Sequence, residues 1–551
     1  MLSFIAGLFL AISINYTPPV DYEMSLAGNF GEPRPNHFHN GIDVKTGGVE
    51  GKPIYSIGEG YVSRITVGMF GFGNAVYVAH PDGKTSVYCH LKSFSPRIKS
   101  LLRKWQYENQ SYIADVRLSP LDCPLSEGQF IAVSGNTGAS QAPHLHLELR
   151  DTKTGRLLDP LSVLSSYIKD ETPPMAHGFL VYPMKDLGLF NKNRTCQAFR
   201  FISHNMEEHF IGWGKIGFGL WANDYSEATY NRYGVYETIL LVDGKEVFHA
   251  CVTDFPSQST RMVNVWGDYG HYYQSGVWYM KSFTTPSNRL DMLKADDSLG
   301  IVDINEERDY HLEYILRDIF GNTSNYKFVV SGIAQNISKE DDDGDFTLML
   351  KWDKTNCYSL PGMQLVIPYG TLADDIHLRP EVRQKEGKSS PMYSFSNTSY
   401  PLLQWAELSI AVKGKVKDPS KLFIVGHDDK YRYYGGEYRN GWVTGQIRDL
   451  GLLYELDYDD EAPEITPVRQ EQWSKLAVVE LEVDDNKSGI KTYKGYVDGR
   501  FVLFEKVEKC SMVVCDLSDT PIEKTGNVHH LKFFATDHRE NTRVFNTKIV
   551  Y

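Results

Sequence analysis

Two segments of the chain contain residue types that bind metal ions. "NHFHNGIDV" (residues 36–44) holds two histidines and an aspartate, and "APHLHLEL" (142–149) holds a His-x-His pair. A catalytic zinc ion takes three protein ligands and leaves a position open for water, and two histidines with one aspartate supply that count. A His-x-His pair or an H-x-x-x-D turn alone more often belongs to exposed or hydrogen-bonded residues. The combination of the two segments therefore carries the prediction.

The first segment must bring its side chains together through a turn. Asn40-Gly41 disfavours a helix. His39 and Asp43 are therefore expected to converge between strand ends and not as neighbours on one helix face.

The second segment alternates as a strand does. This pattern places His144 and His146 on one face, about 7 Å apart. His90, in "VYCHLKS", stands at the end of another predicted strand, and Cys89 is expected to face the other way as a buried thiol. His80 precedes "PDG" and is interpreted as a hairpin residue.

The elements that must position these residues are short strands. Residues 25–165 contain glycine turns joined by β-like runs such as "GNAVYVAHPDGKTSVYCHL" and "GQFIAVSGNTG", which is typical of a compact antiparallel β domain. The pattern is interrupted at 94–128, which contains "SPRIKSLLRKWQYENQSYIADVRLSP" and is expected to form a helix or a surface loop.

Residues 25–165 resemble the M23 family of zinc metallopeptidases, the lysostaphin and LytM-type peptidoglycan endopeptidases. The matching segments are "FHNGIDV", "GKPIYSIGEGYV", "GFGNAVYVAHPDGKTSVYCHLKSF" and "GQFIAVSGNTGASQAPHLHLEL". The resemblance implies a Zn²⁺ ion held by His39, Asp43 and His146. It also implies that His90 and His144 are the catalytic pair around a metal-activated water.

Two features of this sequence are compared with the family pattern. His37 lies two residues before the implied ligand His39, and the resemblance makes it a residue of the rim and not a ligand. The segment 94–128 is longer than the turn usual in the family. We interpret it as an insertion beside the active-site groove that shapes substrate choice or covers the cleft.

Beyond residue 170 the chain repeats itself. "DETPP" (170–174), "LWANDYSEATYNRYGVYETILLVDGKEVF" (220–248) and "LRDIFGNTSNYKFVV" (316–330) are echoed by "DDEAPEI" (459–465), "LEVDDNKSGIKTYKGYVDGRFV" (481–502) and "ATDHRENTRVFNTKIV" (535–550). Each copy has an acidic-Pro entry, an acidic turn, an Asp-Gly hairpin and a closing strand after an Asp…Asn turn. Short strands at this spacing predict immunoglobulin-like sandwiches.

Composition limits the partners and the compartment. The net charge is −13 and no Lys/Arg run occurs, so a nucleic-acid partner has no electrostatic support. Seven cysteines without CxxC spacing indicate neither a disulfide framework nor a structural zinc site. Residues 1–16 are interpreted as a signal peptide, with a buried N-terminal strand as the alternative. No later segment is long and apolar enough to span a membrane.

The predicted fold is mainly β, with a lysostaphin-like antiparallel β metallopeptidase domain followed by immunoglobulin-like β-sandwich domains. The expected parts are a peptidase domain (17–169), a sandwich (170–336), a β-rich middle domain (337–458) and a second sandwich (459–551). The acidic "SKEDDDGDF" (338–346) is interpreted as a linker, because it lacks the ligand spacing of a calcium loop.

The predicted function is hydrolysis of peptide crosslinks in bacterial peptidoglycan. We expect the protein to be exported to the periplasm or cell envelope, where the C-terminal β domains position the catalytic domain or bind envelope proteins. Two alternatives are a non-catalytic activator of a cell-wall amidase and a zinc endopeptidase that acts on proteins.

Overall fold

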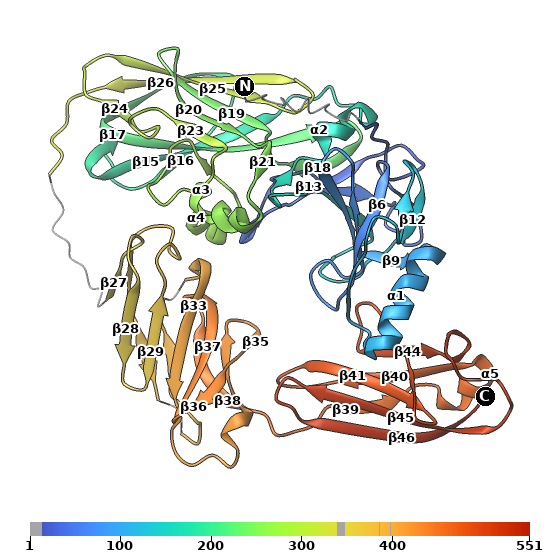
Figure 1. The fold of residues 1–551 in the computed structure, drawn as a ribbon. Coiled ribbons are helices and arrows are strands. Elements are labelled where there is room, and N and C mark those ends of the chain that lie inside the picture. Colours follow the sequence, from blue (N-terminus) through green and yellow to red (C-terminus); the bar gives the residue numbers. More distant parts are fainter. Residues whose placement is uncertain (1–13, 339–347, 385, 397) are drawn as a thin grey trace, which may run out of the picture.

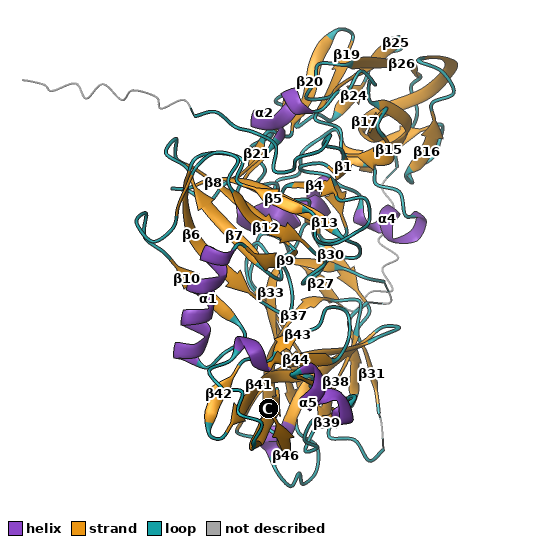
Figure 2. Ribbon diagram, turned by 90° about the vertical axis from the view of Figure 1, so that its right-hand side faces the viewer, coloured by secondary structure: helices purple, strands orange, loops and turns teal. Residues whose placement is uncertain are grey.

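The computed structural model describes residues 14–551 except 339–347, 385 and 397 (Figure 1). Strands dominate the structure and helices are few, which confirms the mainly β prediction (Figure 2). Residues 1–13 of the predicted signal segment and nearly all of the acidic stretch 338–346 lie outside the described residues. Within the described part of the chain, no helix has the length and apolar character needed to cross a membrane.

The N-terminal β domain is built on one large antiparallel sheet. Each strand alternates or is wholly buried, because one face packs against the apolar core and the other carries the site. The order of the main strands is β1 (Leu26–Gly28), β4 (Ile42–Lys45), β13 (His144–Asp151), β8 (Lys84–Cys89), β7 (Ala75–Ala79), β6 (Gly60–Val67) and β10 (Ala114–Arg117).

A second, three-stranded sheet covers the core. It runs in the order β5 (Pro53–Tyr55), β12 (Phe130–Ser134) and β9 (Leu91–Phe94). The fully buried Ile54, Tyr88 and Leu147 belong to the core between the two sheets. The two sheets thus give the site a rigid base.

The segment 94–128 contains a helix and two short strands, the second of which is β11 (Pro124–Leu125). Helix α1 (Pro96–Asn109) begins with proline, which suits the first helical turn, and ends at Gln110 in the left-handed conformation. Ile98 and Leu102 bury one face of α1 in the core, and β10 then pairs with β6 at the sheet edge. The helix alternative of the sequence prediction is therefore confirmed.

Residues 175–332 form a large sheet with two unusually long strands. The main order is β16 (Gln197–Arg200), β15 (Met175–Phe190), β17 (Asn205–Ser226), β26 (Thr323–Gly332), β25 (Asp309–Arg317), β19 (Glu237–Val242), β20 (Lys245–Cys251) and β23 (Leu293–Ala295). Strands β15 and β17 are longer than the short strands that the repeat predicts.

The following β region has two five-stranded sheets around one core. The first is β28 (Asn356–Leu360), β29 (Met363–Ile367), β33 (Pro401–Ala411), β37 (Trp442–Asp449) and β36 (Glu437–Arg439). The second is β31 (Glu381–Arg383), β32 (Met392–Ser394), β38 (Leu453–Tyr458), β34 (Leu422–His427) and β35 (Tyr431–Gly435).

The C-terminal region has two four-stranded sheets around a separate core. One sheet is β39 (Glu464–Pro467), β40 (Val478–Asp484), β44 (Met512–Asp516) and β43 (Glu505–Lys506). The other is β42 (Arg500–Val502), β41 (Ile490–Val497), β45 (Val528–Asp537) and β46 (Thr542–Val550).

Both predicted Asp-Gly hairpins are present. Asp243-Gly244 joins β19 to β20, and Asp498-Gly499 joins β41 to β42. All four residues have positive φ, as a two-residue type I′ turn requires.

The four regions follow one another around a ring that α1 closes (Figure 1). Lys99 and Arg103 form ion pairs with Asp519 at 2.9 and 3.2 Å, and Arg103 also pairs with Glu505. Because residues 99 and 103 are one helical turn apart, they lie on one face of α1. That face therefore holds the C-terminal region against the N-terminal domain.

Candidate metal centre and active site

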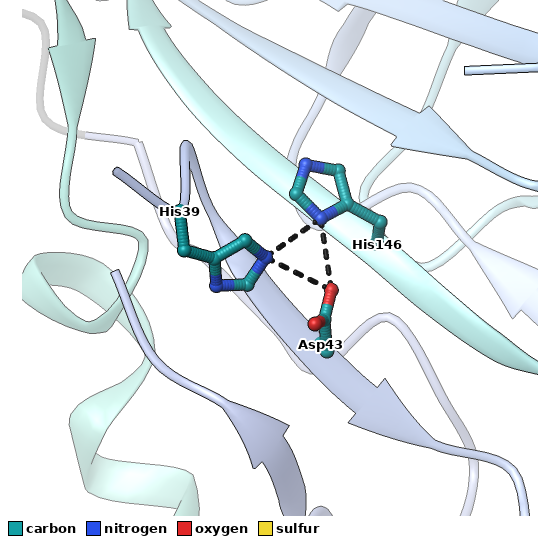
Figure 3. Close-up of side chains that lie close together, drawn as sticks. All are labelled: His39, Asp43 and His146. Carbon is teal, nitrogen blue, oxygen red and sulfur yellow. Dashed lines mark hydrogen bonds and ion pairs between the residues drawn. The ribbon is translucent and has the colours of Figure 1, made fainter. Parts of the chain in front are cut away.

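The three predicted ligands converge (Figure 3). Nε2 of His39 lies 3.0 Å from Oδ1 of Asp43 and 3.0 Å from Nδ1 of His146. Nδ1 of His146 lies 2.9 Å from the same Asp43 oxygen. All three residues are buried, and His39 is only 2% exposed. Two nitrogens and one oxygen therefore surround a single point.

Strand pairing produces this convergence. Strand β4 pairs with β13 so that Asp43 lies opposite His146, and His39 follows strand β3 (His37–Phe38) through a short loop. Gly41 in that loop is needed for close approach, since a Cβ atom there would lie 2.2 Å from the carbonyl oxygen of Leu147. The loop prediction is confirmed, although its physical cause is packing against β13 and not a positive φ.

The remaining nitrogen of each imidazole is fixed by an acceptor. Nδ1 of His39 lies 2.7 Å from the carbonyl oxygen of Asn29, and Nε2 of His146 lies 3.3 Å from Oε1 of Glu148. Because each acceptor holds a ring proton on the outer side, Nε2 of His39 and Nδ1 of His146 are the nitrogens that face the cluster and would bind a metal ion. Such support is characteristic of histidines that bind metal ions.

Burial and charge set the protonation of the cluster. Burial lowers the pKa of His39 to about 4, so its ring is neutral near pH 7. Burial opposes ionisation of Asp43, but the neighbouring His39, His144 and His146 outweigh it and hold the pKa of this carboxyl far below its usual range. For His146, hydrogen bonds to Asp43 and Glu148 outweigh burial and raise its pKa to about 9. The free site thus stores positive charge on His146, which a metal ion would replace.

His90 and His144 stand beside the cluster. Their rings are 4.9 Å apart, and the His90 ring is 5.8 Å from that of His146. Nδ1 of His90 lies 2.8 Å from the carbonyl oxygen of Thr137, which leaves Nε2 as an acceptor. Burial lowers the pKa of His90 to about 3, so it stays neutral. Nε2 of His144 lies 3.3 Å from Oδ1 of Asp43.

His90 has a strained backbone. It follows β8 with φ at 60°, in the left-handed region that residues other than glycine rarely adopt. The turn redirects the chain so that the His90 ring points to the site, while Cys89 is fully buried as predicted. Burial raises the pKa of the Cys89 thiol well above its usual value, so it is no nucleophile.

The cluster opens into a groove of about 1000 Å³ whose lining comes from residues 27–146. His37 lines this groove, and its Nδ1 lies 3.0 Å from the carbonyl oxygen of Pro35, outside the three-residue cluster. No residue of the segment 94–128, all of which is described, lines the groove. The interpretation that this segment covers the cleft is therefore not supported, and α1 contacts the C-terminal region instead.

Two segments of the chain match known protein families. Residues 37–104 match Peptidase family M23, and residues 347–459 match the Zu5-like domain. Residues 37–104 are thus similar to an M23 peptidase domain. A relative of this chain is named as a metalloprotease, so the similarity points to a metal ion.

Relatives match about a quarter of the chain. An uncharacterized metalloprotease of Haemophilus influenzae is 31% identical over 125 residues, which cover 23% of this chain and 21% of that protein. Peptidoglycan DD-endopeptidase ShyA of Vibrio cholerae is 32% identical over 138 residues, covering 24% of this chain and 26% of ShyA. The chain thus spans about a quarter of these relatives.

A solved structure shows a similar partial match. The catalytic domain of lysostaphin from Staphylococcus simulans is 22% identical, covering 26% of this chain and 93% of that domain, with a TM-score of 0.20.

The donor set suits the metal that the family implies. Two imidazole nitrogens and one carboxylate oxygen lie within 4.8 Å of one another, and the outer nitrogen of each imidazole contacts an acceptor. Nitrogen and oxygen donors of this kind suit zinc.

Sequence reasoning missed Glu148 and Arg34. Glu148 lies two residues after His146 on β13, so the alternation that paired His144 with His146 also placed this carboxylate on the same face. Arg34 donates from Nη2 to Oδ2 of Asp43 at 2.7 Å. No spacing in the sequence indicates this contact, because it depends on the short hairpin in which β2 (Pro33–Arg34) pairs with β3.

Proposed function

We propose that the protein is a zinc-dependent endopeptidase that hydrolyses peptide crosslinks of bacterial peptidoglycan after export to the cell envelope. The observation that carries this proposal is the convergence of His39, Asp43 and His146, with the outer nitrogen of each imidazole fixed by a neighbour. The Vibrio cholerae relative is named as a peptidoglycan DD-endopeptidase, which supports peptidoglycan as the substrate.

The residues divide the chemistry between them. His39, Asp43 and His146 would hold zinc, which supplies Lewis acidity and an acidified water when bound. His90, whose Nδ1 is engaged by the carbonyl oxygen of Thr137, would accept a proton at Nε2. His144, on the same side of the cluster, would hydrogen-bond the oxyanion that develops on the scissile carbonyl, and loss of such a donor typically costs about 10²–10³ in rate.

Digestion of purified peptidoglycan tests this function. Wild-type protein should contain near-stoichiometric zinc and release muropeptides, while His146→Ala should lose the zinc and the release. His37→Ala is the matched control, because His37 lines the same groove without belonging to the cluster. Mass analysis of the released fragments identifies the bond.

Two outcomes would refute the proposal. A folded wild-type protein without zinc would favour a non-catalytic activator. Zinc-dependent cleavage of proteins with no release from any wall type would favour a protein endopeptidase.

A further inference from the structure

The repeat in the sequence builds two clusters of aspartates outside the peptidase site. Each copy contributes its entry aspartate, one from its acidic turn and one from its Asp…Asn turn. In each cluster the three carboxylates offer oxygens within 4.8 Å of one another. The clusters are Asp170, Asp224 and Asp318, and Asp459, Asp485 and Asp537.

The same asparagine frame supports both clusters. In the first, the backbone N–H of Asn322 donates to Oδ1 of Asp318 at 2.8 Å, and Nδ2 donates to Oδ2 of Asp318 at 2.7 Å and to the carbonyl oxygen of Asp170 at 3.1 Å. Asn541 makes the three equivalent contacts in the second cluster, at 2.9, 2.7 and 3.0 Å. Two segments far apart in the chain therefore form the same arrangement of aspartates around an asparagine.

The first cluster lacks a protein partner for its charge. Asp224 is only 6% exposed, and its Oδ1 has no hydrogen-bond partner among the residues described. In the same described part of the chain, no lysine or arginine forms an ion pair with Asp170, Asp224 or Asp318. A buried carboxylate without a partner is costly, so the cluster is incomplete as a protein-only arrangement.

The pKa values in the first cluster reflect the same lack of a positively charged partner. Burial, followed by the charge of Asp318, raises the pKa of Asp224 to about 8. Burial also raises the pKa of Asp170 to about 6. A bound cation would reverse both shifts, because it stabilises the ionised carboxylates.

The second cluster has an unpartnered group of its own. Ser488 is 3% exposed, and its Oγ has no hydrogen-bond partner in the described structure. Its backbone N–H donates to Oδ2 of Asp459 at 3.3 Å, which places the serine at the cluster. A hydroxyl oxygen there adds a further potential ligand.

We propose that each cluster binds one calcium ion. All donors are oxygens, and three carboxylates with nearby carbonyl and hydroxyl oxygens suit calcium, which takes six to eight oxygen ligands. Magnesium usually keeps several waters and takes one or two carboxylates, so three buried carboxylates suit it less well. Next to the first cluster, a cavity of about 30 Å³ lined by Asp170 and Asp224 leaves space for an ion or water.

Both sites lie where one region of the chain meets the next. Tyr233 and Ile319, near the first cluster, pack against the core of the peptidase domain. Beside the second cluster, Nη1 of Arg539 donates to the carbonyl oxygens of Leu422 and Gly436 in the preceding region. Calcium would thus rigidify the junction between the first and second regions and the junction between the third and fourth regions.

Calcium titration of the full chain tests the proposal. After metal removal and restoration of one equivalent of zinc, calorimetry should give two calcium ions per wild-type chain. Asp224→Asn and Asp485→Asn should each bind one, and the double variant none. Asp115→Asn is the control, because Asp115 is an exposed aspartate that pairs with Arg64 outside both clusters.

A second probe needs no variant. Terbium should bind the wild-type protein and give luminescence sensitised by two tyrosines. Tyr225 follows Asp224 in the chain, and Tyr233 lies opposite Asp224 on the paired strand β18 (Thr229–Tyr233). Calcium should displace the terbium, and magnesium at equal concentration should not. The proposal is overturned if the wild type binds neither ion, if magnesium displaces terbium as well as calcium does, or if Asp224→Asn and Asp485→Asn both keep the wild-type stoichiometry.

Discussion

Glu148 should control zinc affinity without touching the metal. It is fully buried, accepts from Nε2 of His146 through Oε1, and accepts from Nε of Arg150 through Oε2 at 2.7 Å. Glu148→Gln keeps an acceptor of the same shape but loses its charge, whereas Glu148→Leu removes the acceptor. Loss of such supporting groups typically weakens metal binding about 10–100-fold. We expect about tenfold for Glu148→Gln and up to about a hundredfold for Glu148→Leu.

Competition against a chromophoric chelator at fixed pH measures this affinity, and circular dichroism checks that each variant is folded. Glu480→Gln is the matched control, since Glu480 is a buried carboxylate paired with Arg469 in the C-terminal region. If both Glu148 variants fold and bind zinc as tightly as Glu480→Gln, the tautomer of His146 does not depend on Glu148 and the reasoning is wrong.

Two further predictions concern stability and the ring. Burial raises the pKa of Asp159 to about 7, so this group destabilises the fold increasingly as pH rises from about 4 to 7. In calcium-free buffer, Asp159→Asn should raise the free energy of unfolding at pH 8 by up to about 4 kcal/mol and have little effect near pH 4. Thermal unfolding measures this difference, and the control Asp115→Asn should show no such pH dependence. Arg103→Glu should lose two ion pairs, roughly 0.2–1 kcal/mol each, and add charge repulsion, so that hydrogen exchange in α1 and β43 rises about tenfold while zinc binding persists. The control Arg117→Glu changes an exposed residue of β10 and should leave hydrogen exchange unchanged. Equal hydrogen exchange in both variants would contradict the role of Arg103.

Much of the candidate site could be predicted from the sequence because its side chains are positioned by short, local patterns. The alternation in β13 fixed the shared face of His144 and His146, and the loop at Gly41 fixed the approach of His39 to Asp43. These patterns depend only on strand geometry and short-range sterics.

Other features depend on contacts that no local pattern encodes. The left-handed backbone of His90 arises where β8 must redirect the chain, and the Arg34 contact arises from the hairpin of β2 and β3. The face of α1 that carries Lys99 and Arg103 reads in the sequence as an ordinary solvated helix surface. Its partners lie in the C-terminal region, so only the folded structure shows that this segment closes the ring.

The closing contact also orders events during synthesis. Arg103 and Glu505 are 402 residues apart, so at roughly 5–20 residues per second about 20–80 s pass between their emergence from the ribosome. Throughout that interval a folded N-terminal domain would present this face of α1 to water. This face is formed by Lys99, Arg103 and Tyr107 and not by aliphatic side chains. It can therefore stay exposed until the C-terminal region is synthesised without becoming a site of aggregation.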